Sequence, residues 1–253
     1  VELVPAFLDN YIFILTDEET GKTAVVDPGE SSGVLKALAN SGKRLDSILL
    51  THHHFDHVGG VSELRQKYGC EIYGSEEDQH RLPPLSRSLK DQDSFSIGKS
   101  WCSVIEVPGH TLGHIAFWFP EDKILFCGDT LFSLGCGRLF EGSPQQMWHS
   151  LQKIRSLPEE SQIYCAHEYT LANGKFASYL EPENEELAAY LQKAKEMRSL
   201  NQPTIPCLLK MEKKLNPFLK PLSPPILSKL GIYCSDPLEA FTQLRLRKDS
   251  FVG

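Results

Sequence analysis

The stretch Thr51-His52-His53-His54-Phe55-Asp56-His57-Val58-Gly59-Gly60 places four of the nine histidines of the chain within six positions. It follows the apolar run 47–50, which predicts a short buried strand. In an extended backbone the side chains of His52 and His54 point to the same side, and His53 points to the other. Imidazole and carboxylate groups together suit a borderline divalent ion such as zinc. The pattern H-x-H-x-D-H therefore predicts a metal site in which His53 is not a ligand.

Three later sites have a related form, in which an apolar strand runs into a His or Asp beside a glycine or another small residue. They are Val107-Pro108-Gly109-His110, Phe126-Cys127-Gly128-Asp129 and Cys165-Ala166-His167. Strand ends of this kind bring several loops together at one rim of a sheet. A single strand-end Asp is more often a turn or a helix cap. The four sites together predict that ligands from distant parts of the chain complete the metal centre.

Short strands and helices alternate over residues 1–170, and helical patterns dominate after that point. The expected strands are 11–15, 23–26, 47–50, 72–73, 102–107, 115–119, 124–127 and 163–166, and the expected helices cover 34–39, 61–68, 144–156, 183–200 and the segment from 236 onward. Asp236 and Pro237 have the chemistry of an N-cap and a first helical residue. The proline-rich stretches 203–206 and 217–225 are predicted to be connectors. We therefore expect an α/β domain over 1–170 and an α-helical domain over 171–253.

Composition excludes several classes of protein. The 253 residues are 41% hydrophobic and 23% charged, as in an ordinary globular protein, which excludes collagen, coiled coil and extensive disorder. The formal net charge of −7 argues against a broad nucleic-acid footprint. The same charge would repel an anionic small substrate, unless a local positive site overcomes it. No apolar run is longer than five residues, so no membrane-spanning helix is expected.

Seven cysteines, an odd number without a C-x-x-C pair, favour reduced thiols over a disulfide framework. This favours a cytoplasmic location. No charged-then-apolar leader opens the sequence, although a start at Val1 is compatible with a trimmed organellar leader.

The chain resembles the metallo-β-lactamase superfamily and, within it, the glyoxalase II group, the hydroxyacylglutathione hydrolases. The superfamily resemblance covers about residues 1–170 and rests on Thr51–His57, Pro108-Gly109-His110-Thr111 and Gly128-Asp129-Thr130. The closer resemblance extends to the C-terminus and rests on Gly135-Cys136-Gly137-Arg138-Leu139-Phe140-Glu141-Gly142, His167-Glu168-Tyr169-Thr170, Asn216-Pro217-Phe218-Leu219 and Leu244-Arg245-Leu246-Arg247-Lys248-Asp249. The fold it implies is an αββα sandwich with metals at the edge between the two sheets, followed by a helical substrate-binding domain.

The resemblance also implies a dinuclear centre, with zinc expected first and iron or manganese also compatible. His52, His54 and His110 would hold one ion, Asp56, His57 and His167 the other, and Asp129 would bridge them. Asp56 and Asp129 are the residues expected to act in catalysis. The implied reaction is hydrolysis of a thioester, S-D-lactoylglutathione, by a metal-activated water, which releases D-lactate and glutathione in the second step of methylglyoxal detoxification. No side-chain nucleophile is required, so the cysteines, Cys136 included, are expected to be inert.

Substrate contacts are implied by the resemblance as well. Arg245 and Lys248 are i, i+3 on the last helix and share a face. On the sequence alone such a pair is a solvated basic surface; the resemblance instead implies that it binds the glycine-end carboxylate of glutathione. Arg138, Phe140 and Tyr169 match further contact positions. Phe140 stands where some members have Tyr, which puts one hydrogen bond to the substrate in doubt.

Other readings of the same residues stay open at this point. A mononuclear iron persulfide dioxygenase resembles this chain in the metal motif but generally lacks the long C-terminal helical segment. A phosphodiesterase or ribonuclease of the superfamily is disfavoured by the acidic charge. A binding or regulatory paralogue without activity should lack ligands, and none is missing here. His114, four residues after His110, is either a support for a ligand or a structural histidine. Glutathione thioester is the expected partner, and the chain is expected to be a monomer.

Overall fold

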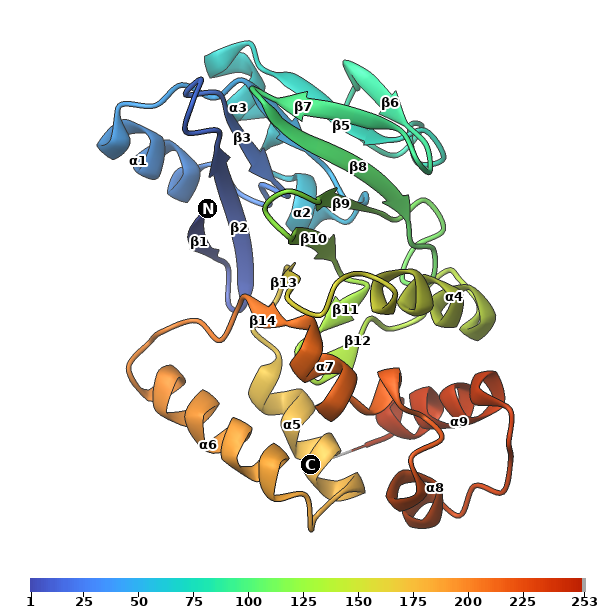
Figure 1. Ribbon diagram of the computed structural model, residues 1–253. Coiled ribbons are helices and arrows are strands. Elements are labelled where there is room, and N and C mark those ends of the chain that lie inside the picture. Colours follow the sequence, from blue (N-terminus) through green and yellow to red (C-terminus); the bar gives the residue numbers. More distant parts are fainter. Residues whose placement is uncertain (252–253) are drawn as a thin grey trace.

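Two six-stranded sheets pack face to face in the computed structural model, which describes residues 1–251 (Figure 1). The first sheet has the order β1-β2-β3-β4-β5-β6 and the second β14-β13-β10-β9-β8-β7, and β11 and β12 form a separate hairpin. The strands of the first sheet are β1 (Glu2–Ala6), β2 (Asn10–Thr16), β3 (Thr23–Val26), β4 (Ser47–Leu49), β5 (Glu71–Ser75) and β6 (Arg87–Leu89). The remaining strands are β7 (Ser94–Ile97), β8 (Ser100–Glu106), β9 (Ile115–Phe119), β10 (Ile124–Gly128), β11 (Leu131–Phe132), β12 (Gly135–Cys136), β13 (Gln162–Cys165) and β14 (Cys207–Leu208).

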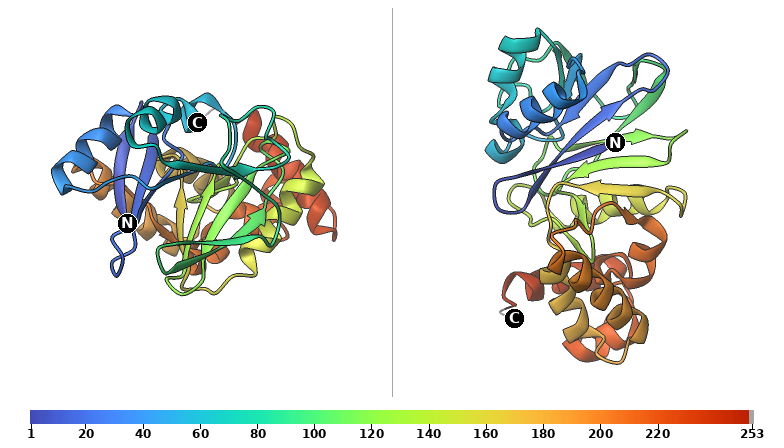
Figure 2. Two further views of the ribbon diagram at one scale, coloured as in Figure 1. Left: turned by 90° about the horizontal axis from the view of Figure 1, so that it is seen from above. Right: turned by 90° about the vertical axis from the view of Figure 1, so that its left-hand side faces the viewer.

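Helices cover both outer faces of this sandwich, and further helices gather at one end of it (Figures 1 and 2). Those before residue 170 are α1 (Ser32–Ser41), α2 (Phe55–Val58), α3 (Val61–Tyr68) and α4 (Pro144–Arg155). Those after it are α5 (Thr170–Leu180), α6 (Glu185–Ser199), α7 (Leu209–Leu215), η1 (Pro217–Leu219, a 3₁₀ turn), α8 (Pro224–Leu230) and α9 (Pro237–Asp249). The N-terminus lies in the sandwich, and the last described residue, Phe251, follows α9 at the helical end.

Strand β2 shows why the molecule has two hydrophobic cores. Successive side chains of a strand point to opposite faces of the sheet. Phe13 is buried between the two sheets with Phe117 and Phe126, whereas Ile12 and Ile14 are buried on the outer face beneath α1 and α3. Because both faces of β2 are covered, its central run 11–15 is apolar at every position rather than alternating.

Several of the predicted elements are confirmed. The antiparallel pairing of β2 with β3 is the expected hairpin. Gly42 and Gly69 end α1 and α3 in the left-handed conformation, with φ of 67° and 64°. Asp236 caps α9, where its carboxylate accepts a hydrogen bond from the Leu238 amide at 3.0 Å.

The prediction was wrong in the segment 217–225, which was expected to be a plain connector. It contains η1, and α8 begins within it at Pro224. Proline suits the first turn of a helix because its missing N–H has no intrahelical acceptor there, so Pro217 and Pro224 start helical turns rather than prevent them. Strands β1, β6 and β7 were also not predicted, and β14 joins the second sheet from within the otherwise helical part. None of the helices within residues 1–251 has the length and apolar character that crossing a membrane requires.

Candidate metal centre

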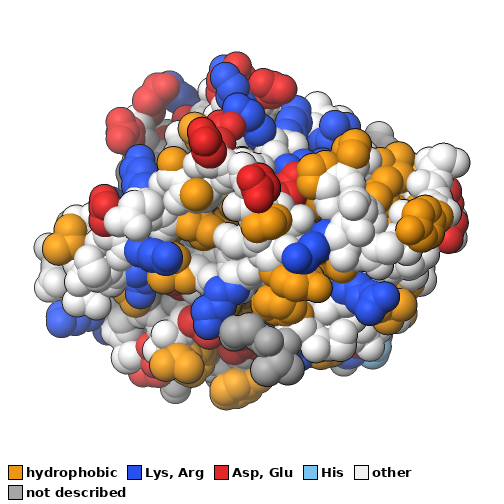
Figure 3. Space-filling model, turned by 90° about the horizontal axis from the view of Figure 1, so that it is seen from below, with side chains coloured by type: hydrophobic (Ala, Val, Ile, Leu, Met, Phe, Trp, Pro, Cys, Tyr) orange, Lys and Arg blue, Asp and Glu red, His pale blue; other side chains and the backbone are white. Residues whose placement is uncertain are grey.

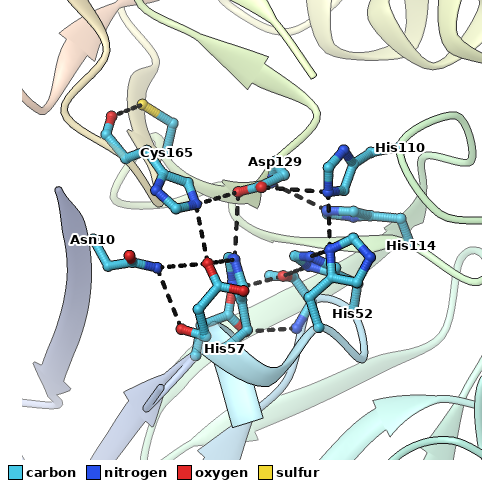
Figure 4. Close-up of polar contacts among 12 residues, drawn as sticks. Asn10, His52, His57, His110, His114, Asp129 and Cys165 are labelled. Carbon is cyan, nitrogen blue, oxygen red and sulfur yellow. Dashed lines mark hydrogen bonds and ion pairs between the residues drawn. The ribbon is translucent and has the colours of Figure 1, made fainter. Parts of the chain in front are cut away.

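The seven predicted ligands come together at one edge of the sandwich, where strands of both sheets end (Figure 4). His52 and His54 follow β4, and Asp56 and His57 lie on the single turn of α2. The other three, His110, Asp129 and His167, follow β8, β10 and β13. Residues up to 115 positions apart in the chain therefore meet because the strands that precede them stop at the same rim.

The first group of ligand atoms consists of three imidazoles. His52, His54 and His110 each offer a nitrogen, and these nitrogens lie within 4.8 Å of one another. His54 Nδ1 is 3.1 Å from His52 Nε2 and 3.1 Å from His110 Nε2. Burial, together with the neighbouring histidines, lowers the pKa of His54 to about 4 and lowers the pKa values of His52 and His110. The three rings are therefore neutral at pH 7, which is the form that binds a cation.

The second group adds a carboxylate. Asp56, His57 and His167 also offer ligand atoms within 4.8 Å of one another. Asp56 Oδ2 is 3.6 Å from His57 Nε2 and 3.5 Å from His167 Nε2. Burial alone would lower the pKa of His167, but Asp129, Asp9 and Asp56 raise it to about 9. A proton therefore occupies this group when no metal is bound, and binding of a cation would release it.

Asp129 lies between the two groups (Figure 4). Its Oδ2 is 3.4 Å from His110 Nε2, whereas Oδ1 is 3.5 Å from His57 Nε2 and 3.4 Å from His167 Nε2. Burial would raise the pKa of Asp129, yet His57, His167 and His110 lower it far below its ordinary value. Asp129 Oδ1 and His57 Nε2 are buried and have no hydrogen-bond partner within residues 1–251. Two buried lone-pair atoms that face each other without a hydrogen-bond partner are the coordinating atoms that a cation needs. These residues therefore fit a metal ion.

Partners outside the centre fix which ring nitrogen faces it. His57 Nδ1 donates to Asp27 at 3.0 Å, His167 Nδ1 to Asp9 at 2.9 Å and His110 Nδ1 to the Arg138 carbonyl at 2.9 Å. With one proton held at Nδ1, the opposite nitrogen, Nε2, faces the centre in each ring and binds a metal once any second proton has been released.

Asp27 is the most heavily used of these partners, and it was not among the predicted site residues. Besides His57, it accepts hydrogen bonds from the amide and hydroxyl of Thr51, at 2.8 and 2.6 Å. The Thr51 hydroxyl in turn lies 3.0 Å from His52 Nδ1. A signal for Asp27 was present in the sequence, since Val25-Val26-Asp27-Pro28-Gly29 is also an apolar strand that runs into an acidic residue near a glycine. No comparable signal marks Asp9.

Two further histidines lie beside the centre: His53, which was predicted not to be a ligand, and His114, whose role the sequence left open. His53 Nδ1 lies 2.9 Å from the buried carboxylate of Asp78, and His53 is absent from both ligand groups. His114 accepts a hydrogen bond from the Asp129 amide at 3.1 Å, and its ring stacks on that of His52 at 4.6 Å. His114 is thus a support for two of the candidate ligands.

Close packing explains the glycines beside the ligands. A Cβ at Gly59 would lie 2.4 Å from the Gly29 carbonyl oxygen, and one at Gly60 would lie 2.5 Å from backbone carbon of Glu30. Both glycines have ordinary negative φ values, so they serve close approach rather than an unusual turn. Gly128, with φ of 48°, does require the left-handed region and sets the direction of the next residue, Asp129.

A cavity of about 540 Å³ opens above the centre. Candidate ligands on its lining are His54, Asp56, His110, Asp129 and His167, and its walls include Arg138, Phe140, Tyr169, Arg245 and Lys248. All five residues predicted to contact substrate therefore face the same space. The Phe140 ring lies 5.1 Å from that of His110, and the Tyr169 ring stacks on that of His167 at 4.8 Å.

The three cations that line the cavity, Arg138, Arg245 and Lys248, differ in how many hydrogen bonds and ion pairs they make with the protein. Arg245 is 4% exposed, donates to the Cys136 carbonyl at 3.0 Å and pairs with Asp249 at 2.7 Å. Arg138 is exposed and Lys248 half-buried, and neither makes an ion pair with any residue that the structure describes. Burial, Arg245 and Arg138 lower the pKa of Lys248, and the nearby Asp249, which pairs with Arg245, offsets this only in part. The sequence did not indicate that the Arg245 guanidinium already binds two groups of the protein, the Cys136 carbonyl and the Asp249 carboxylate.

Comparison with known proteins agrees with this geometry. A family model described as the metallo-β-lactamase superfamily matches residues 6–167, and one described as the hydroxyacylglutathione hydrolase C-terminus matches residues 168–251. Among curated relatives named hydroxyacylglutathione hydrolase, one from Methylococcus capsulatus is 47% identical over 250 residues, covering 99% of this chain and 98% of the relative. Another, from Rhodospirillum rubrum, is 46% identical over 251 residues, with the same coverage.

Solved structures agree at the level of the fold. ETHE1 from Myxococcus xanthus aligns with a TM-score of 0.68 and 21% identity, covering 94% of this chain and 85% of that one. The BLEG-1 B3 metallo-β-lactamase aligns with a TM-score of 0.67 and 22% identity, covering 86% and 98%. TTHA1623, solved in a di-iron-bound form, aligns with a TM-score of 0.58 and 29% identity, covering 65% and 90%.

Proposed function

The chain belongs to the hydroxyacylglutathione hydrolase family of the metallo-β-lactamase superfamily, and we propose that it hydrolyses S-D-lactoylglutathione to D-lactate and glutathione. The observation that carries this proposal is the shared cavity, which has candidate metal ligands on its floor and unpaired cations on its wall. A thioester of glutathione needs both, because its reacting carbonyl is neutral whereas the glutathione part carries two carboxylates. The match of residues 168–251 to the family's C-terminal model favours this reaction over the persulfide dioxygenase alternative.

We assign the ligands as follows. His52, His54 and His110 would hold one divalent ion, and Asp56, His57 and His167 would hold a second, with Asp129 shared between them. These two groups share no residue, and one Asp129 oxygen lies beside each, which supports two ions rather than one. A third possible group, Asp27 with His52 and His57, is set aside because both Asp27 oxygens already accept hydrogen bonds. Zinc is the first expectation from the imidazole and carboxylate ligands, with iron and manganese as the other ions that such ligands accept.

Ions bound in this way would supply a water that ionises near neutral pH and a positive charge for the developing oxyanion. The protein's own residues would prepare that chemistry. Asp27 and Asp9 hold protons at Nδ1 of His57 and His167, so that the opposite nitrogens stay available. Asn10 donates to Asp56 Oδ2 at 2.9 Å and fixes the orientation of this partly exposed carboxylate. Asp56 and Asp129 are the carboxylates nearest the reacting atoms in this assignment.

Binding of the glutathione part would fall to the opposite wall. Lys248 and Arg138 are the free cations, and they would take the carboxylate of the glycine end. Arg245, which already binds Cys136 and Asp249, would add its charge from the lining of the same cavity. Tyr169 and Phe140 would place aromatic surface beside the thioester. In this assignment the division near residue 170 separates a catalytic domain, 1–170, from a substrate-binding domain, 171–253.

We further propose that the protein acts as a monomer in the cytoplasm, without a nucleic-acid partner. Seven free cysteines, six of them buried, support a reducing compartment. The net charge of −7 supports the absence of a nucleic-acid partner.

The test of this function is hydrolysis of S-D-lactoylglutathione by the purified protein, combined with metal analysis of the same sample. We expect turnover and close to two equivalents of divalent metal per chain. The His54→Ala variant removes one imidazole from the first group and should abolish turnover. A metal-loaded wild-type sample without thioesterase activity would contradict the proposed function.

A further inference from the structure

The hairpin β11–β12 is held from outside the sandwich, by side chains that come after residue 170. Three of these side chains donate to backbone carbonyls of the hairpin: Asn173 to Ser133 at 3.1 Å, Asn216 to Phe132 at 3.2 Å and to Gly135 at 2.9 Å, and Arg245 to Cys136 at 3.0 Å. The fourth, Glu212, accepts a hydrogen bond from the backbone amide of Leu134 at 2.8 Å. The hairpin lies where the sandwich meets the helices (Figure 1). Its backbone is therefore satisfied mainly by the other part of the molecule.

Glu212 and Asn216 are at the centre of this set of hydrogen bonds between the helical part and the hairpin. They are one helical turn apart at the end of α7, both are fully buried, and Asn216 Nδ2 also donates to Glu212 Oε2 at 2.9 Å. The second oxygen, Glu212 Oε1, is buried and has no hydrogen-bond partner within residues 1–251. A buried carboxyl group with an unmatched oxygen costs stability. Fold stability alone therefore does not account for Glu212.

The hairpin connects two segments of the metal centre. Asp129 lies two residues before β11, and Arg138 lies two residues after β12. The two ends are tied together, since the Gly137 amide donates to the Thr130 carbonyl at 3.1 Å. The Arg138 carbonyl orients His110. Movement of the hairpin would therefore displace Asp129 and the acceptor that fixes the His110 ring.

The turn of the hairpin is itself strained. Leu134 has φ of 58°, a left-handed conformation that is unfavourable for a residue with a branched side chain. The Leu134 amide is the group that donates a hydrogen bond to Glu212. Such a conformation persists only where surrounding contacts impose it, and here the contact comes from α7.

We propose that Glu212 and Asn216 are positioning residues, which hold the β11–β12 hairpin against α7 and thereby fix Asp129 and the carbonyl that orients His110. The helical part would thus set the geometry of the metal centre as well as bind substrate. The proposal rests on the proposed function only in assuming that the centre binds metal.

The test compares Glu212→Ala with a matched control, Glu181→Ala. Glu181 is also a buried glutamate of the helical part, but it accepts hydrogen bonds from Lys220, Ser223 and Asn184, all outside the hairpin. Two quantities are measured in each full-length variant: hydrogen exchange of peptides that cover 129–138, and the rate at which zinc is lost to a chelator.

For Glu212→Ala we expect faster exchange over 129–138 and zinc loss faster by about 10-fold, the scale on which supports of metal ligands act. Glu212→Gln should restore both quantities to within about twofold, because its amide oxygen still accepts from Leu134 and Asn216. Glu181→Ala should leave both at wild-type values even if it lowers the melting temperature as much.

Wild-type exchange over 129–138 in Glu212→Ala would overturn the proposal, and so would an equal effect of Glu181→Ala. If Glu212→Ala does not fold, Asn216→Ala provides a second variant, because it removes the hydrogen bonds to the Phe132 and Gly135 carbonyls and leaves the acceptor for Leu134 in place. Faster exchange of 129–138 in that variant would support the proposal, and unchanged exchange would contradict it. Hydrogen exchange needs neither substrate nor turnover, so a protein that failed to cleave the thioester would contradict the proposed function and leave this comparison intact.

Discussion

The sandwich and the helical part differ in charge and in the side chains that they bring to the cavity. Residues 1–170 contain 14 Lys and Arg against 24 Asp and Glu, whereas residues 171–253 contain 12 against 9. Lys and Arg side chains are spread over the helical end of the molecule (Figure 3). The acidic part supplies the candidate metal ligands, and the part with an excess of basic residues supplies Arg245 and Lys248. A net charge of −7 is therefore compatible with an anionic substrate, because the field at this cavity is not the average field.

The two parts also differ in how firmly their functional groups are held. The candidate ligands follow buried strands, and three of the rings have a second hydrogen bond that fixes them. Lys248 is a long side chain on a helix, and no carboxylate pairs with it in the described part of the chain. Substitutions at the candidate ligands and their hydrogen-bond partners should therefore change metal binding and turnover, whereas substitution of Lys248 in the helical part should change substrate affinity. Three predictions test this separation.

The largest effect is expected in the sandwich, for Asp27→Asn. The change removes the carboxylate charge that His57 and the Thr51 hydroxyl bind, and it leaves the size of the side chain unchanged. We expect metal affinity to fall by about 10–100-fold, with turnover lost in proportion to unloaded protein. Titration of metal-free protein with zinc measures the affinity, and Asp46→Asn, on an outer loop, is the control. Unchanged zinc affinity in Asp27→Asn would show that Asp27 does not support metal binding through His57.

A smaller and different effect is expected in the helical part, for Lys248→Met. Methionine keeps most of the packing beside Phe176 but removes the charge. A hydrogen bond to a charged group contributes about 1.5–3 kcal/mol, so KM should rise by roughly 10-fold or more while kcat changes little. Steady-state kinetics measure both, with Lys229→Met, outside the cavity, as the control. A fall in kcat at unchanged KM would mean that the two parts do not divide the work in this way.

The smallest effect on metal binding and turnover is expected at the contact between the parts, where the change appears instead in stability against pH. Burial raises the pKa of Glu212 from 4.5 to about 7. The folded state therefore binds a proton more tightly than the unfolded state, so this contribution is fully present below about pH 4.5 and is lost as pH rises through 7. The loss amounts to as much as about 3 kcal/mol.

Glu212→Gln removes this titration while keeping the acceptor for Leu134. The variant should therefore gain stability relative to wild type between pH 5 and pH 8. Urea unfolding of both proteins across this range measures the difference, in which the titrations that the two proteins share cancel. A difference that stays flat with pH would show that Glu212 carries no such proton linkage.

Much of the site was predictable because its signals are local. The alternation in Thr51–His57 placed His52 and His54 on one side and His53 on the other, and the structure has this arrangement. The strand-end pattern found His110, Asp129 and His167, since a strand that stops at a rim leaves the next side chain there. Asp27 shows the same pattern and was overlooked, because it also reads as an ordinary turn before Pro28.

Other features had no local signal. The partial commitment of Arg245 to Cys136 and Asp249 depends on how α9 packs on the hairpin, and helical spacing alone shows only that Arg245 and Lys248 share a face. The start of α8 at Pro224 was hidden because proline both ends helices and begins them, and the surrounding structure decides between the two.

The sequence by itself determined the family, the sandwich of strands and helices, and the side chains offered to the metal centre, because periodicity and strand-end chemistry are written within a few residues. Only the tertiary structure decided which ring nitrogens face the centre and how the helical part grips the β11–β12 hairpin. His167 and Asp9 are 158 positions apart, and Arg245 and Cys136 are 109 apart. Such contacts depend on sheet register and on the packing of one part against the other, which short-range preferences do not encode.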